Sequence, residues 1–343
     1  MHLSKKSLIY KLMVTSLIFG LVTPVLGADL ATTKALAERG NAAAQYDLAI
    51  LYSAGTGVRQ DYDKAVELIK KSANQGYANA QYELAVLYSD GDGVSQDYEK
   101  AIEWYLKSAN QGYSPAQYNL GFAYMNGKGV RQDYDKARSW YLKAANQGHE
   151  ESQYNLGVLY ADGVGVRQDY EKAIEWYLKS ANQGYSPAQY NLGFLYGKGD
   201  GARQDYDKAR SWYLKAANQG LANAQYNLGV LYADGIGVRQ DYDKAIEWYL
   251  KSANQGYVLA QFNLANLYSE DIGAKQSYTQ AVKWYLEAAK QGFPSAQYNL
   301  GYAYVNGQGV RQDYDKAKYW YGKACDNGMQ SGCDSYRIIK ENE

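Results

Sequence analysis

The chain has 343 residues, and its 36 Lys and Arg residues balance 36 Asp and Glu residues, so the formal net charge is zero. This balance argues against a nucleic-acid-binding protein, because such a surface needs an excess of basic residues. Only two histidines and two cysteines occur, which is too few for a conventional zinc site or a Cys–His nucleophile system. We therefore predict no catalytic residue, no metal and no cofactor.

Residues 1–27 have the composition of a secretory signal peptide. Lys5, Lys6 and Lys11 precede an apolar run over residues 12–22, and Gly27 stands at the expected cleavage site. The run is shorter than the about 20 residues that a membrane span needs, and an uncleaved anchor is the alternative. We expect an exported protein, periplasmic or secreted, with no membrane span after cleavage.

A 36-residue unit then repeats eight times over residues 44–331. A fixed period of this length is typical of a solenoid, in which each unit buries its apolar face against its neighbours. The expected repeats are 44–79, 80–115, 116–151, 152–187, 188–223, 224–259, 260–295 and 296–331.

Each copy predicts two helices, which we call helix A and helix B. In the fourth copy Leu156, Leu159 and Tyr160 share one face of helix A, and glycines then end it. Asp169 is a ready N-cap for helix B. Helix A carries glycine or alanine at one register, which predicts close helix approach, and helix B carries a tryptophan from Trp104 to Trp320, which predicts core packing.

Single helices are expected at both ends of the array. Residues 28–43 predict a lone helix B, and residues 332–343 a lone, more polar helix A, as caps that protect the ends of a solenoid. Cys325 and Cys333 are the two cysteines, and an oxidising compartment favours a disulfide between them. Such a bond would join one helix to the next, and two free core cysteines are the alternative.

The repeated string A-x-Y-x-L-G-x-x-Y-x-x-G-x-G-V-x-x-D-x-x-K-A-x-x-W-Y-x-K-A-A-x-x-G resembles the Sel-one-like repeat, a relative of the tetratricopeptide repeat. The resemblance covers Ala44 to about Ser331. It implies a right-handed superhelix with helix A on the concave side, and a function as an adaptor that assembles other proteins. Exported bacterial members are linked to cell-envelope complexes and to host contact.

The terminal sequence KACDNGMQSGCDSY resembles the Cys-bridged units of secreted cysteine-rich members of this family, in which the bridge joins helix B to the next helix A. The expected fold is therefore all-α: a right-handed α/α solenoid of eight helix–loop–helix repeats with terminal capping helices. The seventh copy departs most, with Asp271 in the loop and Ser277 in place of the capping aspartate. We expect a looser loop and a weaker cap there.

Two neighbouring ranks on helix A are the candidate partner-binding surface. The apolar rank includes Phe122, Val158, Phe194 and Val230. The polar rank begins with Asp47 and Glu83 and continues with Asn119, Asn155, Asn191, Asn227, Asn263 and Asn299. The amides could hydrogen-bond an extended peptide while the apolar rank holds its side chains. The alternative is that the asparagines cap or bridge adjacent helices.

Six arginines form a second rank in the loops before helix B: Arg59, Arg131, Arg167, Arg203, Arg239 and Arg311. They could form a basic edge for an acidic polymer, but we expect each to pair with the neighbouring acids. His149, which remains after signal cleavage, replaces a residue that is mostly tyrosine in the other copies, and we expect a packing or surface residue.

Near-identical copies favour binding over catalysis. Residues 96–122 and 168–194 are identical, so the array repeats equivalent surfaces, whereas an active site needs several different groups at one place. We predict a non-enzymatic, monomeric scaffold for a protein or peptide partner. The alternative functions are a cell-wall-directed hydrolase or β-lactam-binding protein, as in some cysteine-rich relatives, and a structural spacer without a partner.

Overall fold

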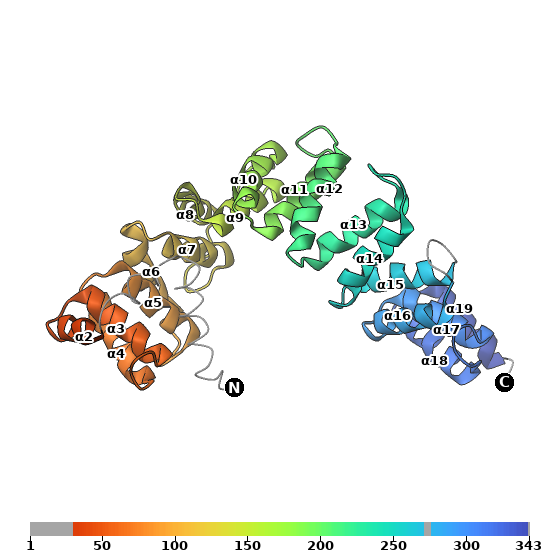
Figure 1. The fold of residues 1–343 in the computed structure, drawn as a ribbon, viewed down its shortest axis with the longest axis horizontal. Helices are drawn as coiled ribbons and strands as arrows, with labels where there is room; N and C mark the ends of the chain where they lie inside the picture. Colours follow the sequence, from red (N-terminus) through yellow and green to blue (C-terminus); the bar gives the residue numbers. More distant parts are fainter. Residues whose placement is uncertain (1–29, 271–275, 342–343) are drawn as a thin grey trace. The chain divides into compact units, whose positions relative to one another are not determined.

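The computed structural model describes residues 30–270 and 276–341, which form α-helices and no strand. The helices follow one another along the chain in the order of their labels (Figure 1). The described residues belong to two compact units, within residues 1–179 and 180–343. The predicted signal peptide, residues 1–27, lies outside the described residues.

The A helices carry odd labels and the B helices even ones. The A helices are α3 (Ala42–Ala54), α5 (Ala78–Asp90), α7 (Ser114–Asn126), α9 (Glu150–Asp162), α11 (Ser186–Lys198), α13 (Ala222–Asp234), α15 (Val258–Ser269), α17 (Pro294–Asn306) and α19 (Gln330–Glu341). The B helices are α2 (Leu30–Glu38), α4 (Tyr62–Asn74), α6 (Tyr98–Asn110), α8 (Tyr134–Asn146), α10 (Tyr170–Asn182), α12 (Tyr206–Asn218), α14 (Tyr242–Ala253), α16 (Tyr278–Lys290) and α18 (Tyr314–Asp326). The all-α solenoid with a helix at each end is confirmed.

The predicted caps define the helix ends. Asp97 accepts a hydrogen bond from the backbone N–H of Lys100 at 3.0 Å and so satisfies a free donor at the start of α6. Gly91, with φ of 77°, ends α5 in the left-handed conformation that glycine adopts at little cost.

The seventh copy has the expected weaker cap. Ser277 Oγ accepts from Gln280 N at 3.4 Å, against 2.9–3.0 Å for the aspartates of the other copies. Residues 271–275, where we predicted a looser loop, lie outside the described residues.

The small-residue rank of helix A permits close helix packing, as predicted. A Cβ added to Gly121 would lie 2.5 Å from the ring of Tyr141, and one added to Gly193 would lie 2.6 Å from Tyr213. Each tyrosine comes from helix B of the same copy and lies in the space that the missing side chain leaves. Close packing of this kind offsets the helix propensity lost at glycine, about 1 kcal/mol.

The tryptophan rank belongs to the core, as predicted. Trp248 and Trp284 are buried, and other members of the rank pack against clusters of buried leucine, alanine and tyrosine. Lysines one turn later add a contact that the sequence analysis did not identify. Lys107 Nζ lies 3.7 Å from the Trp104 ring centroid, a cation–π contact that covers the outer face of the indole.

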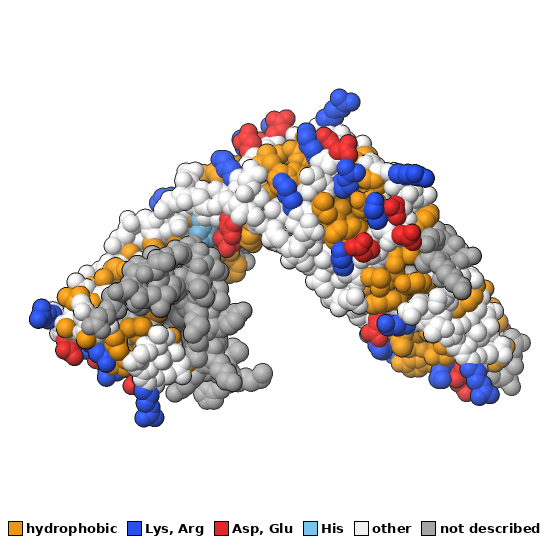
Figure 2. All heavy atoms as spheres, viewed as in Figure 1, with side chains coloured by type: hydrophobic (Ala, Val, Ile, Leu, Met, Phe, Trp, Pro, Cys, Tyr) orange, Lys and Arg blue, Asp and Glu red, His pale blue; other side chains and the backbone are white. Residues whose placement is uncertain are grey.

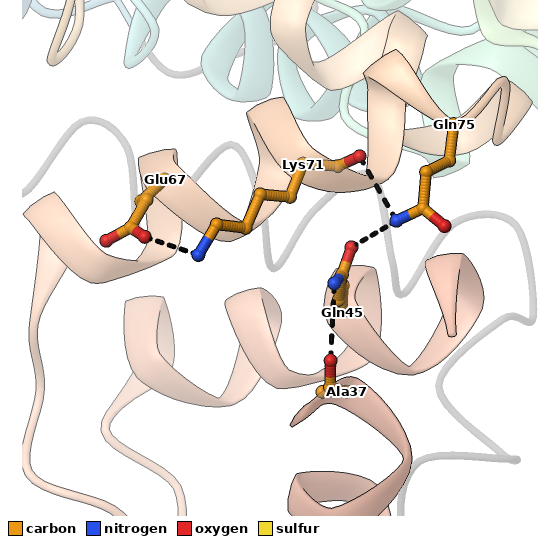
Figure 3. A network of polar contacts seen from close by, with 5 residues as sticks. All are labelled: Ala37, Gln45, Glu67, Lys71 and Gln75. Atoms are coloured by element: carbon orange, nitrogen blue, oxygen red, sulfur yellow. Dashed lines mark hydrogen bonds and ion pairs between the residues drawn. The ribbon is translucent and has the colours of Figure 1, made fainter. Parts of the chain in front are cut away.

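The A helix of each full repeat carries a buried glutamine, which hydrogen-bonds the neighbouring B helices. Gln45 donates through Nε2 to the backbone oxygen of Ala37, at the end of α2, over 3.2 Å. Its Oε1 accepts from Gln75 Nε2, at the end of α4, at 2.6 Å (Figure 3). We call this arrangement the glutamine bridge. Gln81, Gln117, Gln225 and Gln261 make the same pair of contacts.

The disulfide between Cys325 and Cys333 is present. It joins the last turn of α18 to the first turn of α19, so it ties the final helix to the last full repeat. The sequence prediction of this bond is confirmed. The carboxyl-terminal cap thereby acquires a covalent attachment that the amino-terminal cap, α2, lacks.

Gln225→Leu is expected to lower the free energy of unfolding by about 1–3 kcal/mol. Leucine is similar in size but removes both hydrogen bonds of the bridge; Ala217 O keeps its bond from Gly220 N, and the Gln255 amide keeps its contact with Lys251 O. Urea unfolding followed by circular dichroism would measure the change. Glu247→Ala, which removes an exposed ion pair with Lys251, is the control and should cost at most about 1 kcal/mol. Equal losses in both variants would contradict a structural function of the bridge.

Candidate functional site: the pockets between successive A helices

The A helices enclose a pocket where two of them meet a B helix. In the first unit a cavity of about 460 Å³ lies between α5, α6 and α7. Val86 and Glu83 line it from α5, Ile102 from α6, and Asn119 and Phe122 from α7. We call this cavity the α5–α7 pocket. Two residues of the predicted surface, Asn119 and Phe122, therefore lie together at one hollow.

The second unit contains the equivalent pocket, five repeats later in the sequence. This α15–α17 pocket has a volume of about 310 Å³ and lies between α15, α16 and α17. Asn299 and Tyr302 take the positions of Asn119 and Phe122, while Val282 takes that of Ile102. The same three-helix hollow thus forms in both units from residues in the same register of the repeat.

The apolar rank is partly open to solvent. Phe122 and Phe194 keep 46% and 44% of their surface exposed, and Tyr302 keeps 50%. Val158 and Val230 are smaller and half-buried. Exposed aromatic side chains beside a hollow are typical of partner-binding surfaces, because they bury much apolar area with few rotatable bonds.

The asparagine rank bridges helices inside each unit. Asn263 Nδ2 lies 3.4 Å from the hydroxyls of both Tyr226 and Tyr249, on the preceding A and B helices. Asn119 hydrogen-bonds Tyr82 and Tyr105 in the same way. Equivalent contacts to tyrosine are made by Asn155, Asn227 and Asn299. These contacts agree with the alternative that the asparagines bridge adjacent helices. Hydrogen bonding of the same amides to a peptide stays a prediction. Asn191 is half-buried like the other asparagines of the rank.

Helix B also contributes to the pockets, which we did not predict from the sequence. Tyr98, the first residue of α6, and Ile102 line the α5–α7 pocket, and Tyr278 and Val282 occupy the same places in the α15–α17 pocket. A tyrosine follows the capping residue in every copy, which was the available signal. Its place at the pocket could not be read from helix A alone.

The expected pairing of the arginine rank is wrong. All six arginines are exposed, and none forms an ion pair with a residue in the described ranges. The nearby aspartates are already engaged: Asp313, two residues after Arg311, caps α18 and pairs with Lys316 Nζ at 3.1 Å. On the face shown in Figure 2 basic and acidic side chains are interspersed, so no field of one sign covers it.

His149 is a packing residue, which agrees with the prediction. Its ring is stacked on Tyr118 with 5.0 Å between centroids, and its Nδ1 accepts a hydrogen bond from Ser152 N at 3.4 Å at the start of α9. Glu151 Oε2 lies 3.3 Å from the same nitrogen. Burial lowers the pKa of His149, and this effect outweighs the opposing one of the Glu151 carboxylate.

The described residues contain no group of three or more His, Cys, Asp or Glu side chains placed to hold a metal ion. Among the described helices, none has the length and apolar character required to span a bilayer.

The Sel1 repeat model matches eight consecutive segments: residues 42–77, 78–113, 114–149, 150–185, 186–221, 222–257, 258–293 and 294–329. The chain belongs to the Sel1 repeat family. Each matched segment begins at or beside the first residue of an A helix, two residues before the repeat start that we chose from the sequence. Sel1 repeats form scaffolds that typically mediate protein–protein interaction, and the fold and repeat number agree with this family.

Two solved structures resemble the whole chain. A Sel1 repeat protein from Oxalobacter formigenes is 31% identical, with a TM-score of 0.71 over 98% of this chain and 93% of that one. A protective antigen of uropathogenic Escherichia coli strains with an SLR fold is 29% identical, with a TM-score of 0.68 over 98% of this chain and 91% of that one. The comparison with curated proteins gives no match.

Acidification is expected to destabilise the chain through His149. Because burial lowers its pKa in the folded state, its contribution is complete above the unfolded pKa of about 6.5 and is lost as the pH falls below it. His149→Tyr restores the residue that other copies carry at this position and removes the titrating group. Between pH 8 and pH 5 the wild type should lose more stability than this variant in urea unfolding. Equal losses would contradict the assignment.

Proposed function

We propose that this Sel1 repeat protein is an exported scaffold that binds a protein or peptide partner on the face formed by its A helices. The observation that carries the proposal is the recurrence of the three-helix pocket. The α5–α7 and α15–α17 pockets occupy the same register in different units, each beside an exposed aromatic residue, Phe122 or Tyr302. The same hollow in the same register of each unit indicates a binding surface that the repeat itself provides.

The contacts that such a partner would make follow from the side chains at the pocket. Phe122 and Val86 offer apolar surface, at about 25 cal/mol per Å² buried, and Ile102 lies between the two A helices. An extended segment can place one of its side chains in such a hollow while the neighbouring residues contact the exposed ring beside it. The asparagines support this surface by holding the tyrosines beneath it through hydrogen bonds.

Export is supported by the composition of residues 1–27 and by the disulfide between Cys325 and Cys333, since such bonds persist in oxidising compartments. The similar Escherichia coli protein is a protective antigen, which fits a function at the cell envelope or in contact with a host. We place the present chain in the same setting.

The test is affinity capture from cell-envelope and secreted fractions with the mature chain as bait. A variant that combines Phe122→Ser, Phe194→Ser and Tyr302→Ser removes exposed aromatic rings without touching the asparagine bridges. We expect it to lose the partner, with a decrease in affinity of at least about tenfold, or about 1.4 kcal/mol.

The matched control combines Leu142→Ser and Leu214→Ser, two leucines on B helices with 41% of their surface exposed. This control should retain the partner. If the control loses the partner while the aromatic variant keeps it, binding occurs on the B helices and the proposal is wrong. Urea unfolding of each variant shows whether the fold is intact.

A further inference from the structure

The first two copies differ from the others at the polar rank. Asp47 and Glu83 occupy the register at which six later copies carry asparagine. Glu83 is buried, with 5% of its surface exposed, and it lines the α5–α7 pocket. The α5–α7 pocket therefore contains a carboxylate at a position where six later copies carry an amide.

The charges around the α5–α7 pocket favour a cation. Glu83 and Asp90 line it from α5, and Lys128 lines it from the loop after α7. Lys128 is exposed at the rim, where its Nζ lies 4.4 Å from the ring centroid of Tyr98. The lining therefore includes two acidic side chains and one basic side chain. The buried one of the three is the acidic Glu83.

The walls of the same pocket are apolar. Val86 and Phe122 stand on opposite A helices, and Ile102 lies between them on α6. The α15–α17 pocket differs here, because Asn266 replaces Val86 and its Oδ1 accepts from the Tyr285 hydroxyl at 2.7 Å. Of these two pockets, only the α5–α7 pocket combines a buried carboxylate with an aliphatic wall.

The surroundings of Glu83 strengthen its field. Burial raises the pKa values of Tyr46 and Tyr82, and the Glu83 charge raises them further. The same charge raises the pKa of Tyr113 after the larger effect of burial. Three tyrosines thus lie close to this mostly buried carboxylate, and a cation placed near a partly desolvated acid is attracted more strongly than near an exposed one.

We propose that the α5–α7 pocket binds the basic side chain, arginine or lysine, of an extended segment of the partner. The aliphatic stem would lie against Val86 and Phe122, and the charged end would lie beside Glu83 and Asp90. The pocket volume of about 460 Å³ lies in the range of small-ligand sites, roughly 300–1,000 Å³. This inference rests on the proposed function and adds the chemistry that the amino-terminal end of the surface selects.

The variant Glu83→Asn tests the proposal with little risk to the fold, because six other copies carry asparagine at this register. The probe is a set of fluorescent nonapeptide pools in which only the central residue is fixed, and binding is measured by fluorescence anisotropy. Pools with central arginine or lysine should bind the wild type about tenfold more tightly than pools with central leucine or glutamate.

Glu83→Asn should abolish this preference. The control Asp234→Asn, which changes the acid equivalent to Asp90 in the sixth copy, should leave it intact. A profile without a basic preference, or a preference that persists in Glu83→Asn, would overturn the inference.

The outcome separates this inference from the proposed function. If Phe122→Ser abolishes the binding of all pools and no basic preference exists, the A-helix face still binds and only the inference fails. If no pool binds the wild type, the inference fails as well, and the capture experiment decides the proposed function independently.

Discussion

The array depends on the hydrogen bonds that connect each buried glutamine of the A helices to the neighbouring B helices. Stacking one copy on the next buries this amide, and a buried amide without partners costs roughly 1–3 kcal/mol. The glutamine bridge meets this constraint: Gln225 donates to Ala217 O and accepts from Gln255, so one buried side chain connects three consecutive helices. The same bond recurs from copy to copy, which fixes the register of stacking along each unit.

This arrangement leaves aromatic side chains of the A helices accessible to the partner that we propose. The bridge, the Gly–Tyr contacts and the tryptophan rank hold the copies together, while Phe122 and Tyr302 remain half-exposed at the pockets. One residue of the polar rank can differ between copies: Glu83 stands where six later copies carry asparagine. This difference changes the charge of one pocket but leaves the stacking contacts in place. Under the proposed function, the repeat can vary the chemistry of each hollow without changing its fold.

Much of the fold was predictable, because the period places equivalent residues at equivalent registers. The helix ends at Gly91 and Asp97 follow from local backbone chemistry, and the Cys325–Cys333 bond follows from spacing and compartment. The glutamine bridge was missed because a glutamine in the sequence looks like any polar residue until its distant partners are known. The arginine pairing was wrong because the aspartates were already engaged as helix caps. The pockets could not be predicted from one rank of residues, because each pocket is lined by three different helices.

The central claim is that the partner contacts the A helices. The most direct measurement is photo-cross-linking with benzoylphenylalanine at position 122 or 194, compared with position 142 or 214 on the B helices. The structure predicts partner adducts from 122 and 194 and none from 142 and 214, since only the first pair belongs to the pocket-bearing face. Adducts confined to 142 and 214 would contradict the account.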